Sequence, residues 1–140
     1  MAKFHVRART IQGYELILDN GKSHCTVADQ PTGTSTGLGP TPFELCLMSH
    51  AGCYVTICVM TADKMRLPLK GCDVEIDAVK SPETGTVSEE TFDITLKLDA
   101  PQDRVQRLHE VTLKTCPVGI LFEKADVKIT YNLKTVRSSA

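Results

Sequence analysis

Two of the six cysteines stand in segments that could support thiol chemistry. Cys53 lies within a long apolar stretch, and Cys116 ends an amphipathic stretch just before Pro117. The thiolate is the nucleophilic form of cysteine, and a second thiol can convert its oxidised form into a disulfide. The two residues are therefore candidates for a peroxidatic and a resolving cysteine, and thiol redox chemistry is our leading hypothesis.

Cys53 needs a neighbour that activates it, because burial in apolar surroundings raises the pKa of a thiol. His50 lies one turn earlier on the same face of the expected helix, and a histidine at this spacing could polarise the thiol. The alternative is a core histidine that packs beside a buried cysteine.

A metal site is the weaker interpretation of this helix face. Cys46, His50 and Cys53 share it, but Cys46 and Cys53 are about 10 Å apart along the axis, too far to bind one ion. No C-x-x-C motif occurs. We expect no metal and no cofactor. The other cysteines carry no motif and should pack as small apolar residues: Cys25, Cys58 and Cys72.

Length and composition limit the possible functions. The 140 residues fit one domain, 1–140. A net charge of −1 and 5% aromatic residues argue against binding of nucleic acid. No run of 18 apolar residues predicts a membrane span, and the first residues lack an apolar signal core. We therefore expect a cytoplasmic protein.

Residue periodicity predicts an α+β fold in the order β-β-β-α-β-β-α-β, with mainly antiparallel pairing. Asp103 is expected to cap the second helix, and Pro117 either ends that helix or opens a short helical turn. The predicted strands are 3–9, 14–18, 24–28, 72–80, 91–98 and 127–133, and the predicted helices are 43–64 and 104–114.

The helix at 43–64 carries apolar residues on all sides, so we expect it to be buried on most of them. One chain of this size cannot easily supply that cover, and a homodimer would share the burial. Thr41 and Glu44 are spaced as a capping box at its start. Glu44 is thus either a cap or a catalytic carboxylate, with the cap favoured. The loop 29–42, rich in Gly and Pro, is either a lid or an ordinary connector.

Together these segments resemble the OsmC/Ohr family of thiol-dependent peroxidases. The resemblance rests on residues 39–45 (GPTPFEL), 50–53 (HAGC), 103–108 (DRVQRL) and 115–118 (TCPV), and it covers nearly the whole chain. It implies antiparallel sheets wrapped around a long buried helix and a second helix, in an intertwined homodimer with active sites at the interface.

The resemblance also implies an activity that belongs to the oxidative stress response. Cys53 would be the peroxidatic and Cys116 the resolving cysteine, organic hydroperoxides would be the substrates, and an external dithiol would be the reductant. In peroxidases of this family a carboxylate directly follows the proline of the first motif and works with an arginine. Phe43 stands at that place here, with Glu44 one residue later. Arg7 or Arg9 could supply the guanidinium.

Because Phe43 stands where the family has a carboxylate, two further functions remain open. Phe43 could line an apolar substrate pocket or simply pack. A dimer whose interface binds a hydrophobic small molecule would need no reactive cysteine. A thiol-based sensor or carrier would use Cys53 without Cys116.

Overall fold

The computed structural model describes residues 1–33 and 37–137, and the chain divides into two compact units, Met1–Cys46 and Leu47–Ala140. Each unit has its own three-stranded sheet. The prediction of one domain over 1–140 stays a prediction.

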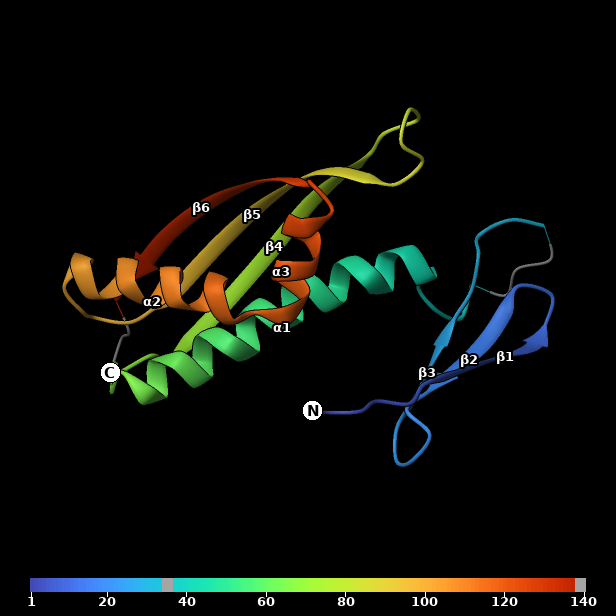
Figure 1. Ribbon diagram of the computed structural model, residues 1–140, viewed down its shortest axis with the longest axis horizontal. Helices are drawn as coiled ribbons and strands as arrows, with labels where there is room; N and C mark the ends of the chain where they lie inside the picture. The colour runs from blue at the N-terminus through green and yellow to red at the C-terminus, as the bar shows by residue number, and fades with distance from the viewer. Residues whose placement is uncertain (34–36, 138–140) are drawn as a thin grey trace. The chain divides into compact units, whose positions relative to one another are not determined.

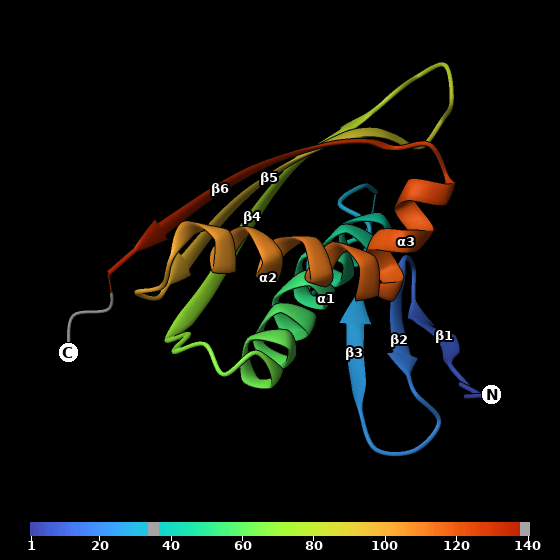
Figure 2. The same ribbon diagram turned by 60° about the vertical axis from the view of Figure 1, so that its left-hand side comes forward.

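The first unit contains an antiparallel meander (Figure 2). Its strands are β1 (Arg7–Gln12), β2 (Glu15–Asp19) and β3 (Cys25–Ala28). The first strand was predicted at 3–9, which is wrong at both ends. Arg7 pairs with Asp19, the last residue of β2, so the residues before Arg7 have no strand to pair with.

The segment that leaves β3 approaches the strand closely. A Cβ atom on Gly39 would collide with the backbone of Val27 and Ala28, so only glycine fits there. The Asp29 amide donates to the Pro40 carbonyl at 3.0 Å. The loop 29–42 was considered as a lid, but residues 34–36 lie outside the described residues, and the lid stays a prediction.

The second unit contains β4 (Gly71–Lys80), β5 (Val87–Lys97) and β6 (Lys128–Val136), with β5 in the middle. β4 and β5 are antiparallel, as expected, whereas β5 and β6 are parallel. Parallel neighbours need a long crossover connection. Here the crossover is α2 (Gln102–Thr115) followed by α3 (Pro117–Lys124). Pro117 therefore opens a separate helix, the second alternative in the sequence prediction.

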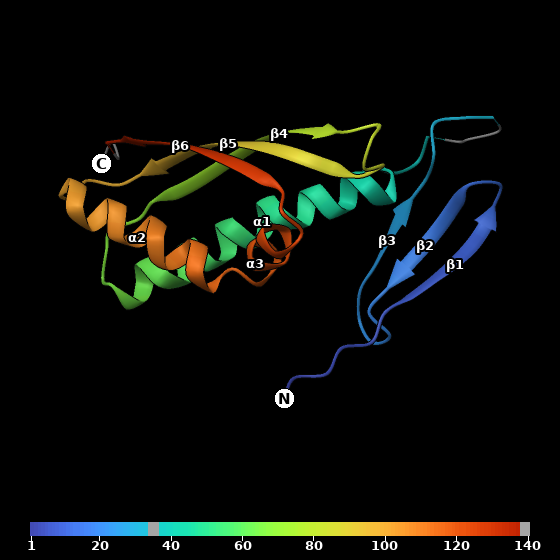
Figure 3. The same ribbon diagram turned by 45° about the horizontal axis from the view of Figure 1, so that its top comes forward.

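The helices of this unit cover one face of its sheet (Figures 1 and 3). β5 supplies the inward Phe92, Ile94 and Leu96, and α2 supplies Val105 and Leu108. The core is completed from α1 (Pro42–Lys64) by the buried residues Tyr54, Cys58 and Ala62.

Within the single chain α1 is buried along one stripe, and the predicted burial of its other sides against a second subunit stays a prediction. The buried residues are His50, Tyr54, Cys58, Thr61 and Ala62. Met48, Val59 and Met60 are 56, 42 and 51% exposed. The apolar residues that periodicity assigned to the core thus leave a large apolar surface uncovered in the single chain.

By length and composition alone α1 could also cross a membrane. This is a weak indication, because the central helix of a water-soluble protein meets the same criterion.

α2 begins at Gln102, and the residue at its N-cap is Pro101, without a side-chain cap. The prediction that Asp103 caps this helix is therefore wrong. The Pro101 carbonyl accepts from the amides of Arg104 and Val105, which closes the first turn. Asp103 lies within that turn, where a carboxylate still interacts favourably with the helix dipole.

A buried hydrogen bond links α1 to α2. The Tyr54 hydroxyl lies 2.6 Å from Nδ1 of His109. Burial strongly raises the pKa of Tyr54, so the phenol keeps its proton and donates it to the imidazole. Burial also lowers the pKa of His109, against a smaller opposing effect of Glu110. His109 is therefore neutral in the folded protein at pH 7.

This neutral histidine predicts a pH dependence of stability. The pKa of His109 is lower in the folded protein than in the unfolded chain. As the pH falls below about 6.5, the unfolded chain therefore binds more protons than the folded protein does. The free energy of unfolding should decline from pH 7 to pH 5. In the His109→Gln variant this free energy should decline less steeply. Thermal unfolding at several pH values measures both slopes. Parallel slopes for the two proteins would contradict this assignment.

Candidate functional site

The structure brings the two predicted cysteines together. Cys53 comes from the middle of α1, and Cys116 lies at the break between α2 and α3. Their Sγ atoms are 3.0 Å apart, with Cys116 as donor and Cys53 as acceptor. Cys116 is only 2% exposed, and Cys53 is partly exposed. Cys53 is thus the sulfur that a solute reaches first.

Cys116 is held as a thiol. Burial, and then its bond to Cys53, raise the pKa of Cys116 to about 11. As the N-cap of α3 it also accepts the Gly119 amide at 3.4 Å, which acts in the opposite direction but is outweighed. At neutral pH the Cys116 S–H is therefore present and points at Cys53, where it can stabilise negative charge on the partner sulfur.

His50, predicted as a possible helper of Cys53, has Glu90 as the partner of its Nδ1 atom, and its action on Cys53 stays a prediction. Its Nδ1 lies 2.8 and 3.1 Å from the two carboxylate oxygens of Glu90, and both side chains are buried. The ring stacks on Phe122 at 4.3 Å and meets Phe92 edge-on at 4.6 Å. These contacts fix the orientation of the imidazole.

Glu90 is the functional candidate that sequence reasoning missed. It is 1% exposed and alternates in phase with the inward residues Phe92, Ile94 and Leu96 of β5. An acid on the apolar face of a strand is costly unless it has a partner. That phase was the signal in the sequence, and His50 is the partner.

Gly119 leaves a gap beside the second cysteine. A Cβ at this position would lie 3.4 Å from the Cys116 Sγ and 3.5 Å from Nε2 of His50. Both atoms therefore border the same small space. The far nitrogen of His50 is turned toward the environment of Cys116.

Glu44 and Thr41 form the capping box that was predicted. The Thr41 hydroxyl accepts from the Glu44 amide at 3.1 Å, and the Glu44 carboxylate accepts from the Thr41 amide at 2.9 Å. The hydrogen bond from the Thr41 amide, and then the Thr41 side chain, lower the pKa of the Glu44 carboxyl. Phe43, proposed from the sequence as part of a substrate pocket, lies in the same first turn and is 36% exposed.

The arginines suggested as activators of Cys53 have another partner. Arg7 lies 3.0 Å and Arg9 3.4 Å from the Asp19 carboxylate. The hydrogen bond from Arg7 is the largest cause of a lowered pKa of Asp19. Both guanidinium groups thus serve to join the edge strand β1 to the end of β2.

A second thiol pair lies deeper in the core. Cys58 is fully buried, and the hydrogen bond from Cys72 lowers the pKa of Cys58 while it raises that of Cys72. These residues pack as expected from the sequence. Within residues 1–33 and 37–137 no three histidine, cysteine or acidic side chains are grouped to bind a metal ion.

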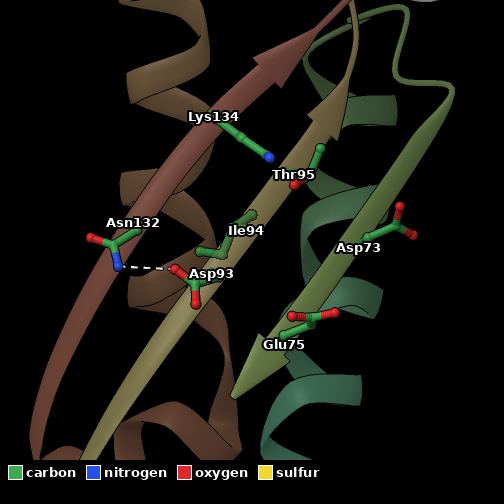
Figure 4. Close-up of a pocket in the computed structure, with 7 residues that line it drawn as sticks. All are labelled: Asp73, Glu75, Asp93, Ile94, Thr95, Asn132 and Lys134. Carbon is green, nitrogen blue, oxygen red and sulfur yellow. Dashed lines mark hydrogen bonds between the residues drawn. The ribbon is translucent and has the colours of Figure 1, made fainter. Parts of the chain in front are cut away.

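The outward face of the second sheet carries a hollow of about 470 Å³ (Figure 4). Asp73, Glu75 and Asp93 line it together with Lys134, and Asn132 donates to Asp93 at 2.9 Å. No thiol or imidazole is among its lining residues. The thiol pair of Cys53 and Cys116 lies on the helices that cover the opposite face.

Comparison with known proteins identifies the family. A family model described as OsmC-like protein matches residues 33–132, well over half of the chain. The chain belongs to the OsmC-like protein family. The resemblance drawn from the two cysteine segments is thereby confirmed.

Solved structures support the same fold. An OsmC-like protein from Mycoplasma pneumoniae matches with a TM-score of 0.85 at 16% identity, covering 96% of this chain and 98% of that chain. The organic hydroperoxide resistance protein OhrB of Bacillus subtilis matches with a TM-score of 0.67 at 17% identity, covering 95% and 98%. An organic hydroperoxide resistance protein from Legionella pneumophila matches with a TM-score of 0.69 at 13% identity, covering 96% and 98%. No curated protein sequence matches this OsmC-like chain.

The capping box allows a test of the two roles considered for Glu44. Glutamine at this position can still accept from the Thr41 amide, so Glu44→Gln should retain both stability and thiol oxidation. Thr41→Ala removes a cap and should cost about 1 kcal/mol in unfolding free energy, with Thr32→Ala as a control. Denaturant unfolding and peroxide consumption measure the two properties. Loss of peroxide consumption in a stable Glu44→Gln protein would instead make Glu44 catalytic.

Proposed function

We propose that this OsmC-like protein is a thiol-dependent peroxidase that reduces organic hydroperoxides. The observation that carries the proposal is the 3.0 Å contact between Cys53 and Cys116. Membership of the family and the likeness to organic hydroperoxide resistance proteins support a peroxide-related redox role in general terms. The assignment of the two cysteines rests on their geometry.

In the first step the Cys53 thiolate attacks one oxygen of the hydroperoxide. The O–O bond breaks, two electrons pass from the sulfur to the peroxide, and the released alkoxide takes up a proton to become an alcohol. Cys53 is left as a sulfenic acid. Its partial exposure, and the Cys116 S–H directed at it, suit Cys53 to this role.

In the second step Cys116 attacks the oxidised sulfur of Cys53. An S–S bond forms, the S–O bond breaks, and the hydroxyl leaves with the Cys116 proton as water. An external dithiol then restores both thiols by exchange. The two sulfurs already lie close together, so the second step needs only a small displacement.

The use of Glu44 as a cap favours two alternative functions. Without a carboxylate beside the thiol, Cys53 would act as a slow sensor or carrier thiol, or the fold would bind a hydrophobic small molecule without chemistry. Catalytic turnover separates these alternatives from a peroxidase, because a sensor oxidises once and a ligand-binding protein does not oxidise at all.

The protein should consume tert-butyl hydroperoxide with dithiothreitol as reductant. Cys53→Ser should abolish turnover, because the nucleophile is lost. Cys116→Ser should allow the first oxidation but expose Cys53 to over-oxidation to sulfinic acid. Intact-protein mass spectrometry and peroxide consumption follow both effects.

Cys25→Ser provides the matched control, because Cys25 is exposed and lies on β3. It should turn over as fast as the unmodified protein. A wild-type rate no higher than that of Cys53→Ser would remove the case for a peroxidase.

We also propose a homodimer, since α1 leaves Met48, Val59 and Met60 exposed. An apolar helix surface of this kind needs a partner. Light scattering after size exclusion should give about twice the 15.3 kDa of the chain. Met60→Glu should weaken the association, whereas a monodisperse monomer of the unmodified protein at micromolar concentration would refute the dimer.

A further inference from the structure

We infer that Glu90 and His50 form a carboxylate–imidazole pair that accepts the proton of Cys116 when this thiol attacks oxidised Cys53. The inference rests on the proposed peroxidase function and assigns a proton acceptor to its second step. His50 is the base in this scheme, and Glu90 is a positioning residue that acts through His50.

The carboxylate fixes which nitrogen of His50 carries a proton. An ionised carboxylate only accepts hydrogen bonds, and both of its oxygens lie within 3.1 Å of Nδ1. Nδ1 therefore bears the hydrogen and donates it to Glu90. In the neutral imidazole Nε2 is then left with a lone pair, the form that can take up a proton.

Packing directs that lone pair toward Cys116. Phe122 stacks on the imidazole and Phe92 meets its edge, so rotation of the ring is restricted. Nε2 of His50 and Sγ of Cys116 both border the space left by the missing Cβ of Gly119, at 3.5 and 3.4 Å from that point. The two atoms are therefore less than about 7 Å apart, a separation that one bridging water molecule can span.

The second step requires a base because Cys116 is a poor nucleophile by itself. Its pKa of about 11 leaves very little thiolate at neutral pH. Two phenols also lie near Cys116. Burial strongly raises the pKa of Tyr54, which donates to His109, and burial, with Glu123, Glu90 and Cys116, raises the pKa of Tyr131 to about 12. Both phenols therefore keep their protons, and neither can serve as the base. His50, whose Nε2 borders the same space as the Cys116 sulfur, is the acceptor that the geometry supplies.

The proton that Cys116 loses in this step leaves with the hydroxyl of Cys53. As Cys116 attacks, its proton moves to Nε2 of His50, and the Glu90 carboxylate stabilises the imidazolium that forms. The hydroxyl leaving Cys53 takes this proton and departs as water. His50 returns to its neutral form, and no further reactant is consumed.

The test follows the two steps separately in a single turnover. Reduced protein is mixed with one equivalent of tert-butyl hydroperoxide, and samples are quenched with dimedone, which traps sulfenic acid. Mass spectrometry then counts sulfenic acid and disulfide with time. Glu90→Gln keeps an acceptor for Nδ1 but removes the charge. Glu89→Gln, exposed and one residue earlier on β5, is its matched control.

Glu90→Gln should form sulfenic acid within twofold of the wild-type rate but form disulfide at least about tenfold more slowly. Its disulfide rate should rise roughly tenfold per pH unit from pH 8 to 10, since hydroxide must now generate the Cys116 thiolate. The wild-type rate should be flatter over that range. Glu89→Gln should match the wild type in both steps.

Gly119→Ala supplies a second variant that keeps His50, Glu90 and both thiols. Its methyl group fits at ordinary contact distance and fills the space between His50 and Cys116. It should slow disulfide formation by a similar factor without slowing the first oxidation. Thermal unfolding of each variant establishes that it is folded.

Disulfide formation at the wild-type rate and pH dependence in Glu90→Gln overturns the inference and leaves the peroxidase intact. An equal loss of both steps also overturns it, because Glu90 would then act on the whole site. If the wild-type protein itself gives neither sulfenic acid nor disulfide, the proposed function fails, and the inference fails with it.

Discussion

The contact between the sulfurs of Cys53 and Cys116 joins the middle of α1 to the break between α2 and α3, and it depends on how the second unit is connected. Because β6 is parallel to β5, the chain must return across the sheet between them. That return is made by α2 and α3 on the face that also holds α1 (Figure 3). Pro117 starts α3 and leaves Cys116 at its N-cap. The crossover thus places the second thiol over the first.

The two sulfurs differ in surroundings although they touch. Cys116 lies in the core, where burial raises its pKa to about 11 and keeps it a hydrogen-bond donor. Cys53 is partly exposed and receives that bond. The same burial that makes Cys116 a good donor makes it a weak nucleophile, so resolution needs a base. The buried pair of His50 and Glu90 answers this need and also explains why an acid lies on the inner face of β5.

Much of this arrangement followed from the sequence, and the exceptions have physical causes. Alternation and turn residues predicted the strands, and the capping box at Thr41 and Glu44 was correct because its bonds are local. The parallel pairing of β6 was missed, although the helix predicted between the last two strands is the type of crossover that parallel neighbours need. The cap assigned to Asp103 was wrong because Pro101 already closes the turn.

The burial of α1 and the role of Glu90 depended on contacts distant in sequence. Apolar residues around the whole helix did not reveal that His50, Tyr54 and Cys58 would form the buried stripe. Glu90 lay outside the predicted strand 91–98, whereas β5 begins at Val87 and places Glu90 inward, in phase with Phe92 and Ile94. Sequence patterns identified the two thiols, and only the structure showed which groups surround them.

In the proposed mechanism Cys53 and Cys116 form one redox couple, and Cys53 is oxidised first. Differential alkylation after one equivalent of cumene hydroperoxide, read by peptide mass spectrometry, measures this directly. This couple predicts loss of two thiols per chain, a single peptide pair linking Cys53 to Cys116, and four cysteines still alkylated. A disulfide that links Cys53 to any other cysteine, or oxidation spread over all six, would contradict it.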